Sequence, residues 1–243
     1  MQHNPPALQM RISVQKNWAL AAALVALGAI ESAAQQGFET PFEWWLGYIS
    51  SAGINARWAV WNDAHYSHRA FFITRHGVTY TPWKRVQITG GYAWLITATA
   101  FSQRLIRPEH RPWGQIEVRL PLTDKLSYRV RFRYDARFRK RIAGGEVLDD
   151  YVFYHRLRLM QGLRYDIGEW HSRKVHFNLL TEALTHHGRE APDQRLDQIR
   201  VFALPGLSLK KATLMGGYHL RYAIRSGAPV LRHGLTVWVV QQF

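Results

Sequence analysis

The sequence predicts an all-β protein, an antiparallel transmembrane β-barrel of about ten to twelve strands that follows a cleaved signal peptide. Three observations favour this fold class. Apolar and polar residues alternate with a period of two through most of the chain after residue 35, which indicates strands with two different faces. The segment 126–139 places its charged residues on one of these faces and its apolar residues on the other. The chain also ends on an alternating segment whose last residue is Phe243.

The amino-terminal segment has the pattern of a secretory signal peptide. Arg11 and Lys16 precede an apolar run of thirteen residues, 18–30. A helix needs about 20 apolar residues to span a bilayer, so this run is too short for a membrane anchor. Ser32 and Ala34 form the small-x-small pattern of a signal-peptidase site. We therefore predict a signal peptide over 1–34 and one barrel domain over 35–243, with a buried amino-terminal helix as the alternative.

The period of two defines eleven candidate strands. They are 42–50, 54–65, 69–80, 85–100, 113–121, 126–140, 151–166, 174–185, 197–208, 211–225 and 231–243. Short connections largely alternate with the longer connections 101–112, 140–150 and 186–196, as in barrels with short periplasmic turns and longer outer loops. An odd count makes the first and last strands run in the same direction, whereas single-chain bacterial barrels have an even number. We therefore expect one element between 36 and 70 to be miscounted, and ten or twelve strands.

The segment 126–139 predicts which face of the wall is wet. Its apolar face carries Tyr128, Val130, Phe132, Tyr134, Ala136 and Phe138, and its charged face carries Arg129, Arg131, Arg133, Asp135, Arg137 and Arg139. Successive side chains of a strand point to opposite faces. A soluble sandwich would bury the apolar face but would leave a uniform row of arginines in bulk water. In a barrel wall the apolar face meets lipid, and the arginines line the lumen.

The same alternation recurs in later strands and predicts a cationic lumen. The candidate lumenal, anion-binding residues are Arg129, Arg131, Arg133, Arg156, Arg158, Arg200, Arg221, Glu117 and Glu182, with Arg119, Asp135, Arg164 and His219 on the same faces. A guanidinium group binds carboxylate or phosphate through two parallel hydrogen bonds. Two interpretations stay open. The charges form an internal network that supports the barrel, or they form a small anion-preferring pore, since arginine rings select anions.

An outer-membrane lipid or lipopolysaccharide hydrolase is the alternative from another functional class. It needs a serine, a histidine and an acid in contact. The chain has candidates in His65, His68, His76, His171, His186, His187, Ser50, Ser67, Ser172 and Ser208, but no Gly-x-Ser-x-Gly motif. We expect His186 and His187 to form a solvated pair in an outer loop. The sequence has no cysteine, no metal-ligand spacing and no phosphate-binding loop, so we predict no catalytic residue, metal or cofactor.

The net charge of +15 favours anionic partners. Nucleic-acid-binding proteins gather lysine and arginine in runs, whereas here arginines alternate with aromatic residues. We therefore expect no nucleic acid, and instead outer-membrane lipids, lipopolysaccharide among them. Candidate loop contacts to lipid phosphates are Arg104, Arg107, His110, Arg111, Arg139, Lys140 and Arg141.

Six short motifs resemble an uncharacterised outer-membrane family, domain of unknown function family 2490. They are Pro108-Glu109-His110-Arg111-Pro112-Trp113-Gly114-Gln115, Tyr128-Arg129-Val130-Arg131-Phe132-Arg133, His155-Arg156-Leu157-Arg158, Asp197-Gln198-Ile199-Arg200, Gly216-Gly217-Tyr218 and Gly90-Gly91-Tyr92-Ala93. Their order covers nearly the whole chain after the predicted signal peptide. The resemblance implies a β-barrel in the outer membrane of a Gram-negative bacterium, and it implies no activity.

The carboxyl-terminal strand resembles the sorting signal of such barrels. Gly234, Val237 and Val239 follow Arg232 at the spacing of that signal, and Phe243 ends the chain. The resemblance implies the barrel-assembly machinery as a transient partner during biogenesis.

Overall fold

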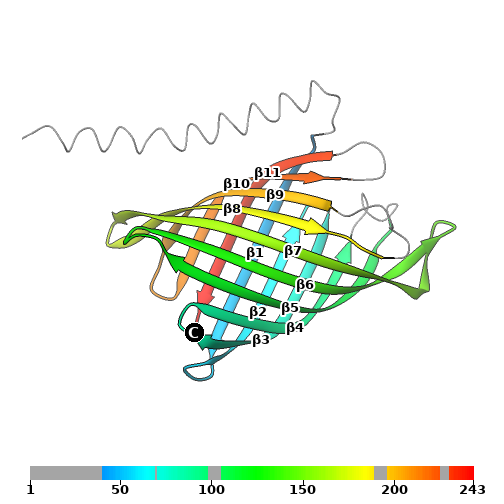
Figure 1. The fold of residues 1–243 in the computed structure, drawn as a ribbon. Helices are drawn as coiled ribbons and strands as arrows, with labels where there is room; N and C mark the ends of the chain where they lie inside the picture. The colour runs from blue at the N-terminus through cyan, green and yellow to red at the C-terminus, as the bar shows by residue number, and fades with distance from the viewer. Residues whose placement is uncertain (1–39, 69, 98–104, 189–195, 225–229) are drawn as a thin grey trace, which may run out of the picture.

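One β-sheet forms the whole described fold (Figure 1). The computed structural model describes residues 40–68, 70–97, 105–188, 196–224 and 230–243, so the predicted signal peptide lies outside the described residues. The strands are β1 (Phe42–Gly53), β2 (Trp58–Ser67), β3 (Phe71–Trp83), β4 (Val86–Thr97), β5 (Arg107–Pro121), β6 (Leu126–Ala143), β7 (Glu146–Trp170), β8 (Arg173–Thr185), β9 (Leu196–Ser208), β10 (Ala212–Ala223) and β11 (Val230–Gln242). None of the described residues belongs to a helix long and apolar enough to cross a membrane.

Eleven strands close the barrel, so the expectation of ten or twelve from an even-number rule is wrong. The segment 36–70 was not miscounted, because β1 and β2 both lie in it. Consecutive strands pair antiparallel, and β1 pairs parallel with β11 from Phe42–His233 to Ser51–Gln242. We call this parallel pair the seam. When consecutive strands are antiparallel, a barrel with an odd number of strands can close only through one parallel pair. Closure leaves no strand edge unpaired.

The two ends of the barrel differ. The tight-turn end holds the short turns after β1, β3, β5, β7 and β9, together with Phe243. The long-loop end holds the connections after the even-numbered strands. There the predicted loop 140–150 is wrong, because β6 and β7 continue as a hairpin that turns at Gly144 and Gly145 (Figure 1). Both glycines have positive φ, 59° and 80°, a backbone conformation that glycine adopts without steric cost. The predicted loop 101–112 is also too long, since β5 begins at Arg107.

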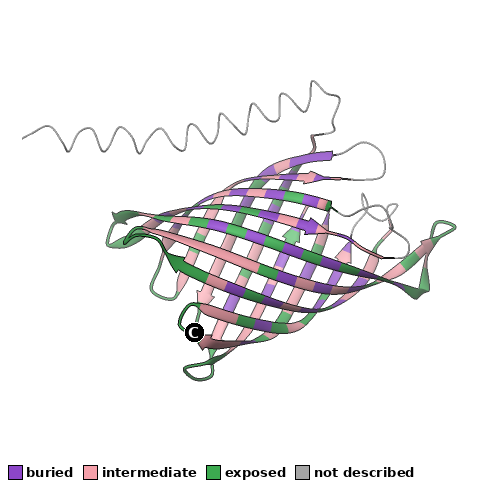
Figure 2. Ribbon diagram, in the orientation of Figure 1, coloured by how far each residue is buried: buried purple, intermediate pink, exposed green. Residues whose placement is uncertain are grey.

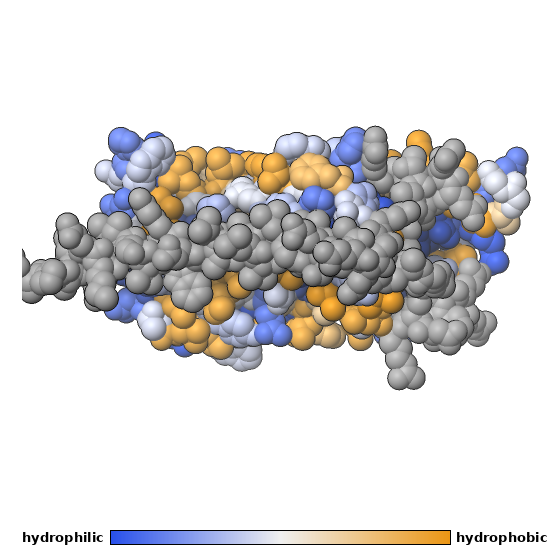
Figure 3. Space-filling model, turned by 90° about the horizontal axis from the view of Figure 1, so that it is seen from above, coloured by the Kyte–Doolittle hydropathy of each residue, from blue (hydrophilic) through white to orange (hydrophobic). Residues whose placement is uncertain are grey.

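Side chains alternate between the interior and the outer wall along each strand (Figure 2). On β6, Phe132 is 49% exposed, whereas its neighbour Arg133 is 3% exposed. Leu157 and Leu159 of β7 are likewise exposed, whereas Arg156 and Arg158, which alternate with them, are buried. Seen from above, hydrophobic atoms lie along the outer wall and hydrophilic atoms gather toward the two ends (Figure 3). The barrel is therefore inverted relative to a soluble protein, with its charges inside and its apolar side chains outside.

Part of the interior is nevertheless apolar. One cluster contains Trp45, Leu180, Phe202 and Leu204, with Phe71, Met215 and Trp238 packed against it. A second contains Ile73, Ala93, Leu95 and Trp113, with Trp61 and Phe71 packed against it. The charge alternation of β6 and β7 did not predict these clusters, which come mainly from other strands. They fill space that a narrow barrel would otherwise leave empty.

Candidate functional site: an arginine-lined cavity

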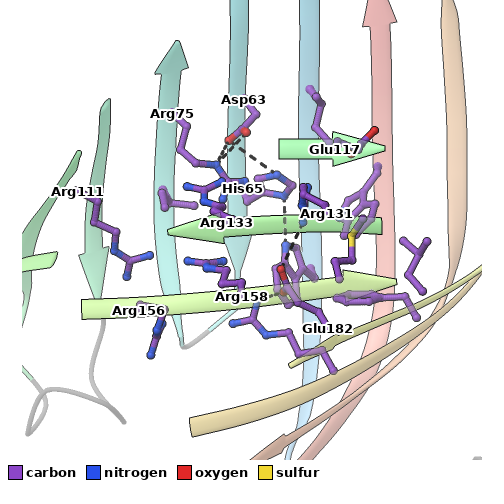
Figure 4. Close-up of a pocket in the computed structure, with 18 of the residues that line it drawn as sticks. Asp63, His65, Arg75, Arg111, Glu117, Arg131, Arg133, Arg156, Arg158 and Glu182 are labelled. Carbon is purple, nitrogen blue, oxygen red and sulfur yellow. Dashed lines mark hydrogen bonds and ion pairs between the residues drawn. The ribbon is translucent and has the colours of Figure 1, made fainter. Parts of the chain in front are cut away.

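A cavity of about 390 Å³ lies inside the barrel, and all eleven strands contribute to its lining. Its most frequent lining residue is arginine. The twelve arginines are Arg75, Arg111, Arg119, Arg129, Arg131, Arg133, Arg137, Arg139, Arg156, Arg158, Arg200 and Arg221. Figure 4 shows charged side chains from β2, β3 and β5 to β8 gathered in this space. The cavity is therefore the part of the lumen that arginines line most densely.

The arginines of β6 line the cavity from one end to the other and show where it narrows. The side chain of Arg129, toward the tight-turn end, is 33% exposed. The side chain of Arg133, near the middle of the strand, is only 4% exposed. That of Arg139, toward the long-loop end, is 15% exposed. The interior is thus closely packed at mid-height and more open toward each end.

The closely packed middle is an ion-pair layer around Asp135. Arg133 Nη2 lies 2.8 Å from Asp135 Oδ1, and Arg158 Nε donates to Asp135 Oδ2 at 2.7 Å. The guanidinium carbon of Arg133 also lies 4.2 Å from the centre of the Trp113 ring, a cation–π contact. Asp135 is fully buried. We call Arg133, Asp135 and Arg158 the central layer.

Two further carboxylates link strands around the central layer. Glu182 of β8 accepts from Arg131 of β6 at 3.3 Å and from Arg200 of β9 at 3.0 Å. It thereby connects two strands that are not neighbours of each other. On another side of the interior, Arg75 Nε donates to both oxygens of Asp63, at 2.7 and 2.8 Å.

One carboxylate at the long-loop end serves three guanidinium groups. Glu109 Oε1 accepts from Arg111 and Arg137, each at 2.5 Å, and Glu109 Oε2 lies 3.1 Å from Arg139 Nε. The expectation that Arg111 and Arg139 lie in an outer loop is therefore wrong, since both are inside β5 and β6. They turn inward because Glu109 supplies a buried counter-charge. Arg104, another predicted loop contact, lies outside the described residues.

His186 belongs to the same end of the cavity. Arg137 Nη1 lies 3.0 Å from His186 Nδ1, and the imidazole stacks on Tyr154 with 4.4 Å between ring centres. The predicted solvated His186–His187 pair is therefore wrong for His186, which is only 7% exposed. His187 instead pairs its backbone with His155. Burial of His186 extends the cavity lining beyond the end of β8.

At the tight-turn end the ionic network is looser. Glu117 accepts from Arg119 Nε at 2.7 Å, and Arg129 Nη1 lies 4.0 Å from the other oxygen of Glu117. The side chain of Arg119 is 55% exposed. This end of the cavity is therefore the more accessible part of the cationic lining.

The charges of the cavity do not balance. Twelve arginines line it, together with four carboxylates, Asp63, Glu117, Glu182 and Asp197. Three more carboxylates, Glu43, Glu109 and Asp135, are buried and pair with lining arginines. Twelve positive groups thus face seven negative groups, an excess of five positive charges. Lining charges of mainly one sign create a potential that attracts counter-ions.

A second buried cluster crosses the seam. Glu43 of β1 accepts from Arg221 Nε at 2.9 Å, and His219 Nε2 lies 3.1 Å from Glu43 Oε1. Thr236 Oγ1 of β11 lies 2.8 Å from His219 Nδ1. The order hydroxyl, imidazole, carboxylate is that of a nucleophile, base and acid. However, Thr236 has no exposed surface, and neither it nor His219 lines the cavity.

The predicted serine and histidine candidates do not come together. Within the residues that the structure describes, no serine hydroxyl makes a hydrogen bond to a histidine: Ser50 binds the backbone oxygen of Asn62, and Ser67 Oγ is buried without a partner. Nor does any group of three or more His, Asp and Glu side chains in those ranges have the geometry of a metal site.

Most of the predicted lumenal residues line the cavity. They are Glu117, Arg119, Arg129, Arg131, Arg133, Arg156, Arg158, Glu182, Arg200 and Arg221. Asp135 and His219 are buried beside it. Arg164 does not line the cavity and pairs with Asp166 at 2.9 Å. Anion binding by these residues stays a prediction.

Sequence reasoning missed six titratable residues of the cavity lining: Asp63, His65, Arg75, Arg111, His186 and Asp197. Asp63, His65 and Arg75 occupy alternate positions of β2 and β3, so the period of two was the available signal. It was weak because these strands mix charged, aromatic and small residues on the same face. Arg111 was assigned to the predicted loop 101–112, although it lies inside β5 between Pro108 and Pro112.

The comparison with known families decides the classification. A family model described as "Protein of unknown function (DUF2490)" matches residues 42–230, which is most of the chain and nearly all of the barrel. The chain belongs to the DUF2490 family. This confirms the resemblance carried by the sequence motifs. Within the DUF2490 barrel, the motif from Pro108 to Gln115 lies in β5 and includes Glu109, the carboxylate that pairs with three arginines.

Among solved structures, the barrel is similar to a chain described as "NanC porin structure in rhombohedral crystal form". The TM-score is 0.43 and the sequence identity is 15%, over 75% of this chain and 87% of that chain. A search of curated proteins finds no match.

The predicted assembly-signal residues lie on β11. Val237 and Val239 lie on the outward face of the strand, whereas Gly234 faces Glu43 across the seam. Phe243 N–H donates to Ser51 O at 2.9 Å, and its own carbonyl accepts from Gly53 at 3.1 Å. Recognition of these residues by an assembly machinery stays a prediction.

Proposed function

We propose that this DUF2490 protein is a β-barrel of the Gram-negative outer membrane and that its lumen is a small anion-preferring pore. A closed sheet satisfies its backbone groups internally, and closed barrels and helices are the structures that can span a bilayer. The outer wall supplies an apolar surface, as at Leu46, Phe72, Ile116 and Leu159, each at least 38% exposed. The predicted signal peptide supports export of the chain.

Aromatic side chains at both ends of the outer wall support a membrane position. Toward the long-loop end, tyrosine hydroxyls contact histidine Nδ1 atoms at 2.5 to 3.2 Å. The pairs are Tyr66–His68, Tyr92–His110, Tyr134–His155 and Tyr218–His233. Toward the tight-turn end, Trp58, Trp83, Trp170 and Phe243 are exposed. Two such girdles would lie at the two interfaces of the bilayer.

The lipid partners follow from this placement. The wall between the girdles would contact outer-membrane lipids, and His110 would reach the head-group level. Two of the cationic groups predicted to contact lipopolysaccharide are already paired on the β6–β7 hairpin, Lys140 with Asp149 and Arg141 with Asp150, each at 2.7 Å. These two pairs make the hairpin a weak contact for phosphate. We therefore assign the lipid contacts mainly to the outer wall.

The excess of five positive charges in the cavity is the observation that carries the anion preference. Glu109, Asp135 and Glu182 are each shared by two or three arginines, so the network remains cationic overall. A ring of arginines admits anions and repels cations. The central layer narrows the route for ions through the lumen, so the conductance should be small.

Planar-bilayer recording with the purified barrel tests the proposal. In a potassium chloride gradient we expect small channels whose reversal potential moves toward the chloride equilibrium potential. A reversal potential close to the potassium equilibrium potential would overturn the proposed anion preference. The absence of conductance in repeated reconstitutions would overturn the proposed pore.

The Thr236–His219–Glu43 cluster is the one observation that favours the alternative, a lipid or lipopolysaccharide hydrolase. Two features oppose it. Thr236 is fully buried, and Glu43 is also bound by Arg221, as expected for a seam that is held together by charge. Release of fatty acid from outer-membrane lipids by the purified protein, abolished in Thr236→Val, would favour the hydrolase; no release favours the structural role.

A further inference from the structure

The lining of the cavity is divided into two unlike walls. Nine of its twelve arginines come from three neighbouring strands, β5, β6 and β7. Trp45, Trp61 and Trp238 come from β1, β2 and β11. In the order of strands around the barrel, β1 and β11 are each five positions from β6. We call the arginines of β5, β6 and β7 the cationic wall and the three tryptophans the aromatic wall. The two walls therefore lie on opposite sides of the cavity.

Trp45 is the centre of the aromatic wall, which also includes Phe71 and Phe202. The ring of Trp45 lies 5.3 Å from that of Phe71, 5.4 Å from that of Phe202 and 6.4 Å from that of Trp238. These four rings meet at edge-on angles of 73° to 86° around Trp45. All four residues also line the cavity. A ligand in the cavity would therefore meet ring surface on this side.

The two walls approach each other at Arg200 and Glu182. The guanidinium carbon of Arg200 lies 5.1 Å from the centre of the Trp45 ring, and Arg200 also donates to Glu182. Glu182 in turn accepts from Arg131 of the cationic wall. A molecule with an acidic group and an apolar body could therefore contact a guanidinium group and a ring at the same time. A simple hydrophilic anion would use only one of the two walls.

We infer that the cavity takes amphiphilic anions, namely carboxylates attached to a flat aromatic body of one or two rings. The inference rests on the proposed function, because it names the substrate class of the same lumen. The carboxylate would bind the guanidinium groups of the cationic wall. The ring would pack on the aromatic wall, where removal of apolar surface from water is favourable. A volume of about 390 Å³ lies in the range of small-molecule sites.

A purely structural aromatic wall makes a different prediction. Rings that only fill a narrow barrel would give no preference among anions of similar size. Binding should then depend on charge alone. The experiment therefore compares three probes: 2-naphthoate, which has both features, gluconate, which has only the carboxylate, and 2-naphthylmethanol, which has only the rings.

Isothermal titration calorimetry of the full barrel in detergent, with protein-free micelles as the blank, measures the three affinities. We expect 2-naphthoate to bind about tenfold or more tighter than either other probe, since the apolar and ionic contacts combine. Equal affinities for 2-naphthoate and gluconate would overturn the inference, and so would equal affinities for 2-naphthoate and 2-naphthylmethanol.

Matched variants locate the site. Trp238→Gln removes a ring of the aromatic wall, and Trp44→Gln removes an outward ring that is 46% exposed on the adjacent strand. We expect the first variant to lose the preference for 2-naphthoate over gluconate and the second to keep it. If Trp238→Gln does not fold, Trp61→Gln, which removes another lining ring of the aromatic wall, replaces it. A preference for 2-naphthoate that survives in the folded inward variant contradicts the aromatic wall.

The cationic wall has its own pair of variants. Arg131→Gln should lower the affinity for 2-naphthoate and bring it close to that for 2-naphthylmethanol. Arg173→Gln, at an exposed position in the β7–β8 hairpin, should change neither the affinity for 2-naphthoate nor that for 2-naphthylmethanol. An unaltered affinity in Arg131→Gln contradicts the assignment of that wall.

Conductance separates this inference from the proposed function. Chloride-selective channels without a preference for 2-naphthoate would leave the pore in place and reject the amphiphilic ligand. A 2-naphthoate preference without any conductance would reject the pore and keep the binding site.

Discussion

Arg158 Nε lies 2.7 Å from Asp135 Oδ2, and the two side chains are 8% and 0% exposed. The pair joins β7 to β6, and Arg133 contacts the other carboxylate oxygen. Two guanidinium groups therefore depend on one buried carboxylate. Such a pair contributes to stability chiefly because removal of one partner leaves the other charge buried without compensation.

Asp135→Asn should be strongly destabilising for this reason. The neutral amide leaves Arg133 and Arg158 without a counter-ion, and we expect a loss of about 3 to 5 kcal/mol. Urea unfolding of the barrel in detergent measures the change. Asp149→Asn is the control, because Asp149 pairs with Lys140 on the exposed hairpin and its loss should leave the unfolding midpoint close to that of the wild type. Similar midpoints for both variants would contradict the central layer as a stabilising element.

Arg131→Glu should change ion selectivity. Arg131 lines the cavity and its side chain is 21% exposed, so the substitution moves the lumen charge by two units toward neutrality. We expect the reversal potential in a potassium chloride gradient to move toward zero or change sign. Arg173→Glu makes the same charge change in the exposed β7–β8 hairpin and should leave the reversal potential near the wild-type value. A lower heat stability without any change in selectivity would indicate a closed ionic network instead of a pore.

Gly234→Ala should impair closure of the barrel. A Cβ at this position would overlap the backbone of Glu43 across the seam. Gly216→Ala is a matched control on β10, because its Cβ would meet its nearest neighbours at 3.9 and 4.0 Å, an ordinary contact distance. Refolding from urea into detergent micelles, without any assembly machinery, measures closure directly. Equal refolding yields would show that the close approach at the seam is not required.

Deletion of Phe243 tests the predicted assembly signal. The deletion removes the backbone hydrogen bonds of Phe243 with Ser51 and Gly53, whereas Phe243→Ala keeps those bonds and removes only the ring. If the ring is a recognition element, both variants should accumulate poorly in the outer membrane of cells. Phe243→Ala should still refold normally in detergent. Normal accumulation of Phe243→Ala in cells would contradict recognition of the aromatic terminus.

Much of the fold could be predicted from the sequence. A period of two assigns each residue of a strand to one of two faces, and in β6 the faces differ so strongly that Arg133 had to lie inside if Phe132 lay outside. The same reasoning placed Arg129, Arg158 and Glu182 in the lumen. The family motifs could also be recognised from the sequence, because each is a short contiguous segment.

The remaining features depend on which strands meet. The parallel pairing of β11 with β1 forms only when the sheet closes. A local sequence pattern does not specify the partner of an edge strand. The gathering of three arginines around Glu109 also depends on strand register between β5 and β6.

The sequence by itself determined the strands, their two faces and the cationic character of one of them, because side-chain alternation is a property of the local backbone. Only the tertiary structure decided that all eleven strands close into one barrel, through a parallel seam and with the aromatic wall opposite the arginines. The physical reason lies in closure. An aromatic residue satisfies either a lipid-facing or an interior position, so Trp44 and Trp45 are equivalent in sequence, and only closure of the barrel leaves one 46% and the other 5% exposed.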